Sequence, residues 1–169
     1  MSSLTMGHWA GWGDVMSFAI DQRERDGILI LALKGRLILG EPLEMLRERL
    51  LPLLQANPET GRTAVVLDCR ETSYIDSSGL GCLVMAHSRA VQAGGKMPIF
   101  GLNRRGLELM ILTKLSTVFE LYEIEIDAVN SCFEGHKVQH FDILDFVQRH
   151  RAEAETVRGS LSPEPLPEA

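Results

Sequence analysis

Tyr74-Ile75-Asp76-Ser77-Ser78-Gly79-Leu80-Gly81 is the stretch that decides the fold, because it joins an apolar strand to an amphipathic helix. Before it, the run Ala64-Val65-Val66-Leu67 is continuously apolar, which is typical of a strand buried on both faces. After it, apolar residues recur at helical spacing from Ser78 to about Ala93, and Gly94-Gly95 is a typical helix end. We therefore expect a strand, a connection over 69–76 and a helix that begins at Ser78.

The rest of the chain alternates strands and helices around this unit. A period-two stretch from Phe18 ends at the turn dipeptide Asp26-Gly27, and the apolar run 28–33 follows, which predicts a β-hairpin. Pro42 is placed to open a helix, and Pro52 stands near its last turn or at a kink. The remaining elements are expected as strands over 98–100 and 118–121 and helices over 105–113 and 126–132. This order predicts an α/β fold with a mixed, mostly parallel sheet.

Length and composition indicate one globular domain with additional residues at both ends. The 169 residues are 45% hydrophobic and 24% charged, which is close to the average for a folded protein. Residues 1–16 have no hydrophobic period and are expected to form an irregular extension, and 158–169 carry three prolines and are expected to form a disordered tail. Between them we expect the α/β domain over 17–131, then a linker and an amphipathic helix over 132–157.

Charge and cysteine content argue against several classes of function. The formal net charge is −6, so the chain lacks the basic surface that binding to nucleic acid or to an anionic membrane requires. Three cysteines without a CxxC pair argue against a disulfide framework or a cysteine-rich zinc site, which favours a reducing, cytoplasmic location. No apolar run approaches the roughly 20 residues of a membrane-spanning helix.

The motif Asp76-Ser77-Ser78-Gly79 allows two interpretations. In the structural one, Asp and Ser are preferred at helix starts because their side-chain oxygens accept hydrogen bonds from first-turn N–H groups. In the functional one, a serine hydroxyl at a helix start is exposed, and the N–H groups of Gly79, Leu80 and Gly81 can receive an anion. A phosphate added there would carry about −1.5 to −2 charges and would repel an acidic partner.

This segment resembles the bacterial anti-sigma factor antagonists, which are single-domain proteins of the STAS family. The resemblance includes the strand 65–68 and the helix end Gly94-Gly95, and it extends to Gly35-Arg36-Leu37 and to Leu112-Thr113-Lys114-Leu115 with Val118-Phe119. It covers about residues 17–131. It implies a sheet of four or five strands, mostly parallel apart from the first, which about four helices cover chiefly on one side.

The resemblance also implies a phosphorylation switch. In this family the unphosphorylated protein binds an anti-sigma factor, which is also a serine kinase of the histidine-kinase-like ATPase superfamily, and so frees a sigma factor. The kinase phosphorylates a serine of the motif and ends the binding, and a serine phosphatase restores it. By motif position the acceptor is Ser78, with Ser77 as the alternative. No cofactor is implied, and a weak homodimer stays open.

The resemblance further implies a set of partner-binding residues, namely Asp76, Ser77, Ser78, Gly79 and Leu80. Asp76 would fix the loop and shape recognition by the kinase. Many members place an aspartate shortly after the turn equivalent to Gly35, whereas this chain has Ile38-Leu39-Gly40-Glu41. Because that loop borders the recognition surface in the family, Glu41 is a further candidate contact. This departure concerns the identity of the partner more than the fold.

The sequence does not favour catalysis. A serine hydrolase needs a positioned base, and its usual nucleophile turn has glycine two residues before the serine. Here Ile75 and Asp76 occupy those positions before Ser77 and Ser78, and His87 lies on the apolar face of the following helix. Nucleotide-binding glycine motifs are incomplete. We therefore expect a protein that is not an enzyme and is instead the substrate of a kinase.

The segment after the domain contains three residues of types that bind metal ions. Cys132, His136 and His140 stand four residues apart and would share a helical face. Gly135 interrupts that helix, and no fourth ligand is evident. A solvated linker without metal is the favoured interpretation.

The stretch 141–147 approximates an amphipathic helix. It is either an extra helix packed on the domain or a docking or dimerisation helix. Two functions stay open beside control of a sigma factor: a STAS scaffold subunit of a signalling assembly, and a STAS accessory subunit of a lipid or solute transporter.

Overall fold

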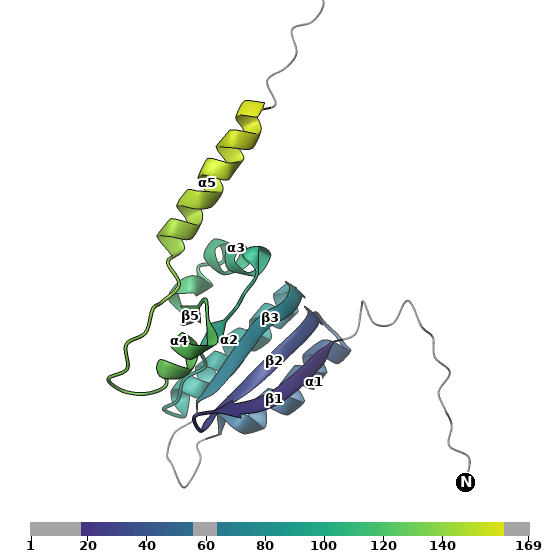
Figure 1. The fold of residues 1–169 in the computed structure, drawn as a ribbon. Coiled ribbons are helices and arrows are strands. Elements are labelled where there is room, and N and C mark those ends of the chain that lie inside the picture. Colours follow the sequence, from purple (N-terminus) through teal and green to yellow (C-terminus); the bar gives the residue numbers. More distant parts are fainter. Residues whose placement is uncertain (1–17, 56–63, 161–169) are drawn as a thin grey trace, which may run out of the picture.

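A mixed sheet of five strands forms the centre of the part of the chain that this computed structural model describes, residues 18–55 and 64–160 (Figure 1). The strands lie side by side in chain order as β1 (Ala19–Arg25), β2 (Ile28–Leu37), β3 (Val65–Ile75), β4 (Ile99–Phe100) and β5 (Leu121–Tyr122). β1 is antiparallel to β2, and the pairings from β2 to β5 are parallel. The predicted α/β class with a mostly parallel sheet is confirmed.

The β1–β2 hairpin follows from its two-residue turn. Asp26 and Gly27 have φ angles of 53° and 79°, the left-handed values that a type I′ turn requires at both positions. The twist of that turn matches the twist of the two strands, so the predicted hairpin forms as expected.

Helices occupy every connection between the later strands. They are α1 (Glu41–Leu50), α2 (Ser77–Gln92), α3 (Arg104–Leu112), α4 (Glu125–Asn130) and α5 (Ile143–Ser160), with the 3₁₀ turns η1 (Leu51–Leu54) and η2 (Leu115–Thr117). Pro52 lies in η1, directly after α1 ends, so it stands at the end of the helix rather than at a kink within it.

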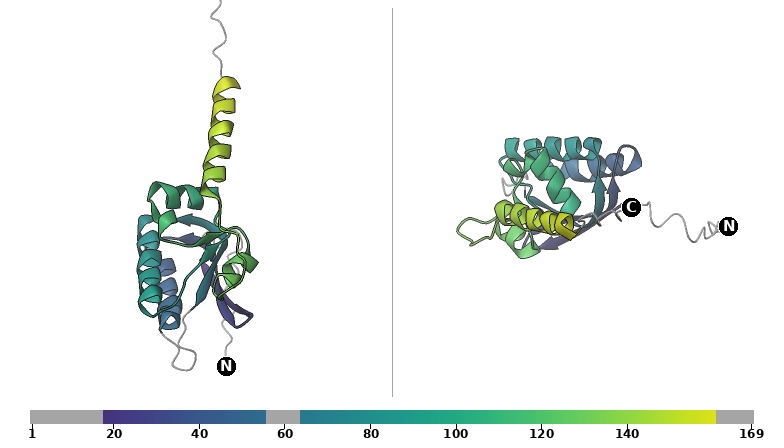
Figure 2. Two further views of the ribbon diagram at one scale, coloured as in Figure 1. Left: turned by 90° about the vertical axis from the view of Figure 1, so that its left-hand side faces the viewer. Right: turned by 90° about the horizontal axis from the view of Figure 1, so that it is seen from above.

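The two faces of the sheet are covered unequally (Figure 2). The larger core lies between one face and helices α1, α2 and α3, and includes Leu33, Leu46, Leu67, Leu83 and Met110. On the other face, α4 covers a smaller cluster formed by Ile30, Val66, Phe100, Tyr122, Ala128 and Val129. The expectation that helices cover chiefly one side is therefore confirmed for the described residues.

The predicted connection over 69–76 is wrong, because β3 continues to Ile75. Its partner β2 also runs on to Leu37, and irregularities in the β2–β3 register interrupt the normal alternation of the strands. Cys69, Thr72 and Ile75 are buried with two exposed residues between each, so the sequence shows no period of two there.

The predicted strand over 118–121 is displaced. Lys114 has a φ of 60°, and the turn η2 follows it, so the chain reaches the sheet only at Leu121. There β5 pairs with the two residues of β4.

The C-terminal helix α5 is longer than the sequence predicts. It runs to Ser160, three residues into the predicted tail from residue 158, because the first tail proline is Pro163 and nothing before it blocks a helix. Its first turns contact the domain through Phe146, and its later part projects away from the domain (Figures 1 and 2). The predicted extension 1–16, the loop 56–63 and the tail from residue 161 lie outside the described residues.

Candidate functional site

Asp76 stands between the end of β3 and the start of α2, where it caps the helix. Its Oδ1 accepts a hydrogen bond from the N–H of Gly79 at 2.7 Å, the arrangement preferred at helix N-caps. Its Oδ2 accepts a second bond, from the N–H of Leu39 at 3.0 Å. The carboxylate therefore joins the β3–α2 connection to the β2–α1 loop. The sequence predicted that Asp76 fixes a loop, but it did not identify the second loop.

These backbone donors lower the pKa of Asp76. The hydrogen bond from Gly79 contributes most, followed by that from Leu39, and both favour the charged carboxylate. The N–H of Ser78 also faces this carboxylate and lowers the pKa further. The group therefore remains ionised at neutral pH and places a negative charge next to the two serines.

Gly79 is required by the close approach of α2 to β2. A side-chain carbon built at this position would lie 2.6 Å from the carbonyl oxygen of Leu37 and 2.8 Å from its Cγ. Gly81 has open space around the same position. Gly79 is therefore needed for packing, and Gly81 is not. The sequence alone did not show which of the two glycines has this role.

Ser77 and Ser78 are the first two residues of α2, and they differ in exposure. Ser77 is exposed and Ser78 is half-buried. The expected anion site is wrong in part, because the N–H of Gly79 already bonds the Asp76 side chain and the N–H of Leu80 bonds the Asp76 carbonyl at 2.9 Å. A phosphate at this helix start would find these two donors occupied.

The other predicted contact residues separate into exposed and buried positions. Glu41 is exposed and is the first residue of α1, two residues after Leu39 in the same loop region. Leu80 is only 7% exposed and packs in the larger core, so little of its side chain is available to a partner. Gly79 is also buried and supports the surface without forming it.

Two exposed apolar side chains near the helix start were missed by the sequence interpretation. Leu39 is 70% exposed in the loop held by Asp76, and Tyr74 is 44% exposed near the end of β3. The guanidinium of Arg36 lies over the Tyr74 ring, 5.1 Å from its centroid. The available signal for Leu39 was an apolar residue directly before Gly40, at the start of a loop. We call Leu39, Tyr74 and Ser77-Ser78 the serine edge.

The start of α3 is anchored at the same end of β3. Asn103 caps α3 by accepting a hydrogen bond from the N–H of Gly106 at 2.8 Å, and its Nδ2 donates to the carbonyl of Thr72 at 3.2 Å. A cavity of about 170 Å³ lies between the two elements and is lined by Tyr74, Asn103 and Arg105 among others. The serine edge therefore rests on three anchored elements, the ends of β2 and β3 and the start of α3.

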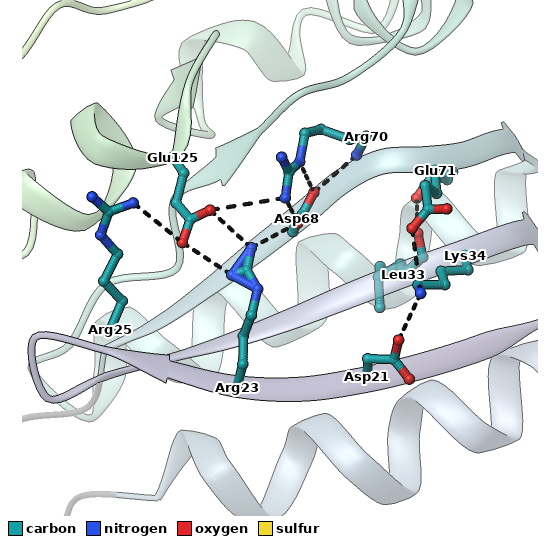
Figure 3. Close-up of polar contacts among 10 residues, drawn as sticks. Asp21, Arg23, Arg25, Leu33, Lys34, Asp68, Arg70, Glu71 and Glu125 are labelled. Carbon is teal, nitrogen blue, oxygen red and sulfur yellow. Dashed lines mark hydrogen bonds and ion pairs between the residues drawn. The ribbon is translucent and has the colours of Figure 1, made fainter.

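A second polar cluster lies on the face of the sheet that α4 covers (Figure 3). Asp68 is 4% exposed, and its carboxylate accepts hydrogen bonds from Arg23 at 2.8 Å and from Arg70 at 2.7 Å. Glu125 of α4 accepts from Arg23 at 3.0 Å, so the cluster connects β1, β3 and α4. Burial alone would raise the pKa of Asp68, but the hydrogen bonds from Arg70 and Arg23 lower it below its usual value.

The geometry gives no support for a serine nucleophile. His87 lies nine residues beyond Ser78 on α2, about 13 Å along the helix axis, and its ring packs edge-on against Phe119 with centroids 5.2 Å apart. A general base must be within hydrogen-bond reach of the group that it deprotonates.

The candidate metal residues do not share a helical face. His136 stacks on Phe133 and His140 packs against Tyr122, in a segment without helix. Within residues 18–55 and 64–160, no group of three or more His, Cys, Asp or Glu side chains is arranged to hold a metal ion. In the same ranges, no helix has the length and apolar character needed to cross a membrane.

Comparison with known families matches residues 19–128 to the STAS domain. The chain belongs to the STAS domain family. The matched part of this STAS protein contains the whole sheet, helices α1 to α3 and the serine edge.

Individual relatives carry one recurring description. The anti-sigma-B factor antagonist of Listeria monocytogenes is 37% identical over 59 residues, which are 35% of this chain and 52% of that protein, so the chain spans about half the length of this curated relative. The anti-sigma F factor antagonist of Paenibacillus polymyxa is 25% identical over 114 residues, 68% of this chain and 94% of the relative. A solved anti-sigma factor antagonist from Mycobacterium paratuberculosis has a TM-score of 0.55 at 17% identity and covers 69% and 94% of the two chains, which confirms the STAS fold.

Proposed function

We propose that this STAS protein is an anti-sigma factor antagonist whose binding surface is the serine edge. In its unphosphorylated form it binds an anti-sigma factor that is also a serine kinase, and so releases a sigma factor in the cytoplasm. The observation that carries the proposal is a capped helix start that presents two serines beside a charged aspartate and two exposed apolar side chains. The names of the Listeria and Paenibacillus relatives support the same role.

Phosphorylation of Ser78 ends the binding in this proposal. A phosphate adds about −1.5 to −2 charges next to the ionised Asp76 carboxylate. Because the N–H groups of Gly79 and Leu80 already have acceptors, these two donors do not neutralise the new charge. The charge therefore faces the partner, where it adds repulsion and steric bulk to a contact built around Leu39 and Tyr74.

The protein itself performs no chemistry in this mechanism. Ser78 is the phosphate acceptor, and Ser77 is the alternative because it is the more exposed of the two. Asp76 accepts hydrogen bonds from both the loop at Leu39 and the first turn of α2, and so fixes their relative position. Glu41 contributes charge at the rim. The kinase supplies nucleotide, magnesium and catalytic base, and a serine phosphatase removes the phosphate.

The test is capture of partners by wild-type protein and by the variants Ser78→Ala and Ser78→Asp, with Ser88→Asp, at an exposed serine further along α2, as the matched control that should still capture the partner. We expect the wild type and Ser78→Ala to capture an ATP-binding kinase, and Ser78→Asp to lose it. Equal capture by Ser78→Asp would contradict the switch at this residue. Phosphopeptide mapping after incubation with the captured kinase and ATP assigns the acceptor, and label confined to Ser77 would move the acceptor to that residue.

A further inference from the structure

Helix α5 leaves much of its length uncovered. Phe146 in its first turns is 9% exposed against the domain, but residues 151–160 are all exposed (Figure 2). Helices in proteins gain most of their stability from packing an apolar face, and short uncovered helical segments are marginal in water. The uncovered part of α5 therefore needs a packing partner that the described part of the chain does not supply.

An apolar stripe continues along α5 past the point where the domain ends. From Ile143, apolar members follow three, four, eleven and fourteen residues later, at Phe146, Val147, Ala154 and Val157, and His150 lies on the same face. This spacing places them on one helical face. The domain buries Phe146 and covers Ile143, Val147 and His150 in part, whereas Ala154 is exposed and Val157 is 59% exposed. The stripe is longer than the domain surface that it contacts.

The neighbouring end of α3 is also apolar. Leu112 is 82% exposed, and Ile111 beside it is half-buried. Together α3 and α5 enclose a groove of about 370 Å³, lined by Ile111 and Leu112 from α3 and by Val147 and Ala154 from α5, among others. The groove is open to solvent, and the C-terminal part of the α5 stripe carries small apolar side chains, Ala154 and Val157, that can pack on its apolar part.

The charged residues beside the stripe are spaced so that two antiparallel copies of the helix can bring opposite charges together. Arg149 and Glu153 lie on one flank, and Arg151 and Glu155 lie on the other, so in each pair the arginine precedes the glutamate by four residues. When two copies of a helix pack antiparallel around a two-fold axis, each flank faces the same flank of the other copy. Arginine then meets glutamate on the flank of Arg151 and Glu155, whereas on the other flank Arg149 already pairs with Asp145, and Glu153 pairs with Arg104 and His150. Among the described residues, Arg151 and Glu155 have no ion-pair partner.

A single position of the two-fold axis aligns both the charged residues and the apolar stripes of the two copies. The two arginine–glutamate pairs have their midpoints at residues 151 and 153. Val147 and Val157 have their midpoint at Ala152, as do His150 and Ala154. A two-fold axis near Ala152 therefore brings Val147 opposite Val157 and Arg151 opposite Glu155.

We propose that α5 is a dimerisation helix through which two copies of this chain pair antiparallel about a two-fold axis near Ala152. The C-terminal half of each α5 lies in the α3–α5 groove of the other copy, next to Leu112. A second copy is the favoured occupant because Arg151 and Glu155 complement each other in an antiparallel pair, in which Val147 also meets Val157. The contact surface shares no residue with the serine edge, so this proposal and the proposed function can fail independently.

Charge reversal tests the pairing in the full-length protein. Arg151→Glu places glutamate opposite Glu155 of the partner, and Glu155→Arg places arginine opposite Arg151. We expect sedimentation velocity to show a dimer for the wild type and a dimer dissociation constant raised roughly tenfold or more for each variant alone. An equimolar mixture of the two variants restores both ion pairs, and we expect it to recover the dimer.

Two alanines of α5 provide a matched comparison. Ala154 lies on the stripe and Ala152 on the opposite side of the helix, and both are exposed. Ala154→Asp is expected to weaken the dimer, and Ala152→Asp is expected to leave it unchanged, with equal helix content by circular dichroism. A wild type that stays monomeric, single charge variants that dimerise like the wild type, or a mixture that fails to recover the dimer would each overturn the proposal.

Discussion

Asp68 and Asp76 belong to the same strand–helix unit but hold the molecule together in different ways. Asp68 is buried on the α4 side of the sheet and accepts hydrogen bonds from two guanidinium groups, those of Arg23 and Arg70. Asp76 is half-buried at the serine edge, and the side-chain bonds it accepts come from backbone N–H groups. The first carboxylate joins side chains of separate elements, and the second sets the path of the backbone.

Asp68 is expected to act mainly on the stability of the fold, and Asp76 mainly on the binding of a partner. Removing the Asp68 carboxylate leaves Glu125 as the remaining carboxylate beside the guanidinium groups of Arg23 and Arg70. This loss is expected to lower the stability of the whole fold. Removing Asp76 frees the loop at Leu39 and one helix end, which affects the surface offered to a partner. We therefore expect stability and partner binding to respond in opposite order to the two substitutions.

The largest stability effect is expected for Asp68→Ala, because two arginines lose their buried acceptor. The free energy of unfolding should fall by about 2–4 kcal/mol at neutral pH, measured by urea denaturation. Since the pKa of Asp68 is lowered in the folded protein, its stabilisation is complete above the ordinary value of 3.8 and is lost as the pH falls through the lowered pKa. The difference from wild type should therefore shrink in acid.

A matched control for this prediction is Asp21→Ala, which removes a carboxylate from an exposed ion pair with Lys34 on the same sheet. Little change in the urea midpoint is expected, because exposed ion pairs contribute little. An equal loss of stability in both variants would show that the Asp68 cluster has no special role.

A smaller stability effect is expected for Gly79→Ala, since the added methyl group would meet the Leu37 carbonyl at 2.6 Å. The cost should be about 1–3 kcal/mol, from a shift of α2 relative to β2. Gly81→Ala is the control, because nothing lies within 4 Å of the new carbon. It should leave stability unchanged or raise it by up to about 1 kcal/mol. Equal behaviour of the two variants would refute the close approach at Gly79.

The smallest stability effect is expected for Asp76→Ala, which removes a helix cap and costs about 0.5–2 kcal/mol. Its effect on capture of the partner should nevertheless exceed that of Asp68→Ala, because the Leu39 loop loses its hydrogen bond. Both variants are compared in one capture assay at a temperature where each is folded by circular dichroism. A stronger loss of capture in Asp68→Ala than in Asp76→Ala would contradict the proposal that Asp76 acts mainly on binding and Asp68 mainly on stability.

Much of this architecture was accessible from the sequence, because its local signals agree with the final fold. Apolar runs predicted the central strands, Asp26-Gly27 predicted the hairpin turn, and Gly94-Gly95 predicted the end of α2 near Gln92. The second half of β3 was missed because register shifts removed the period of two that marks a strand. The short strand β5 was misplaced because it exists only through pairing with β4.

For the serine edge, the sequence alone determined the residue types and their order: an aspartate, two serines and a glycine at a helix start. Local hydrogen-bonding preferences act over a few residues, so such a motif can be identified without the fold. Only the tertiary structure decided that Asp76 also holds Leu39, that Gly79 faces Leu37 and that Leu80 is buried. These facts depend on contacts between β2 and α2, about 40 residues apart in the chain, which no local pattern encodes.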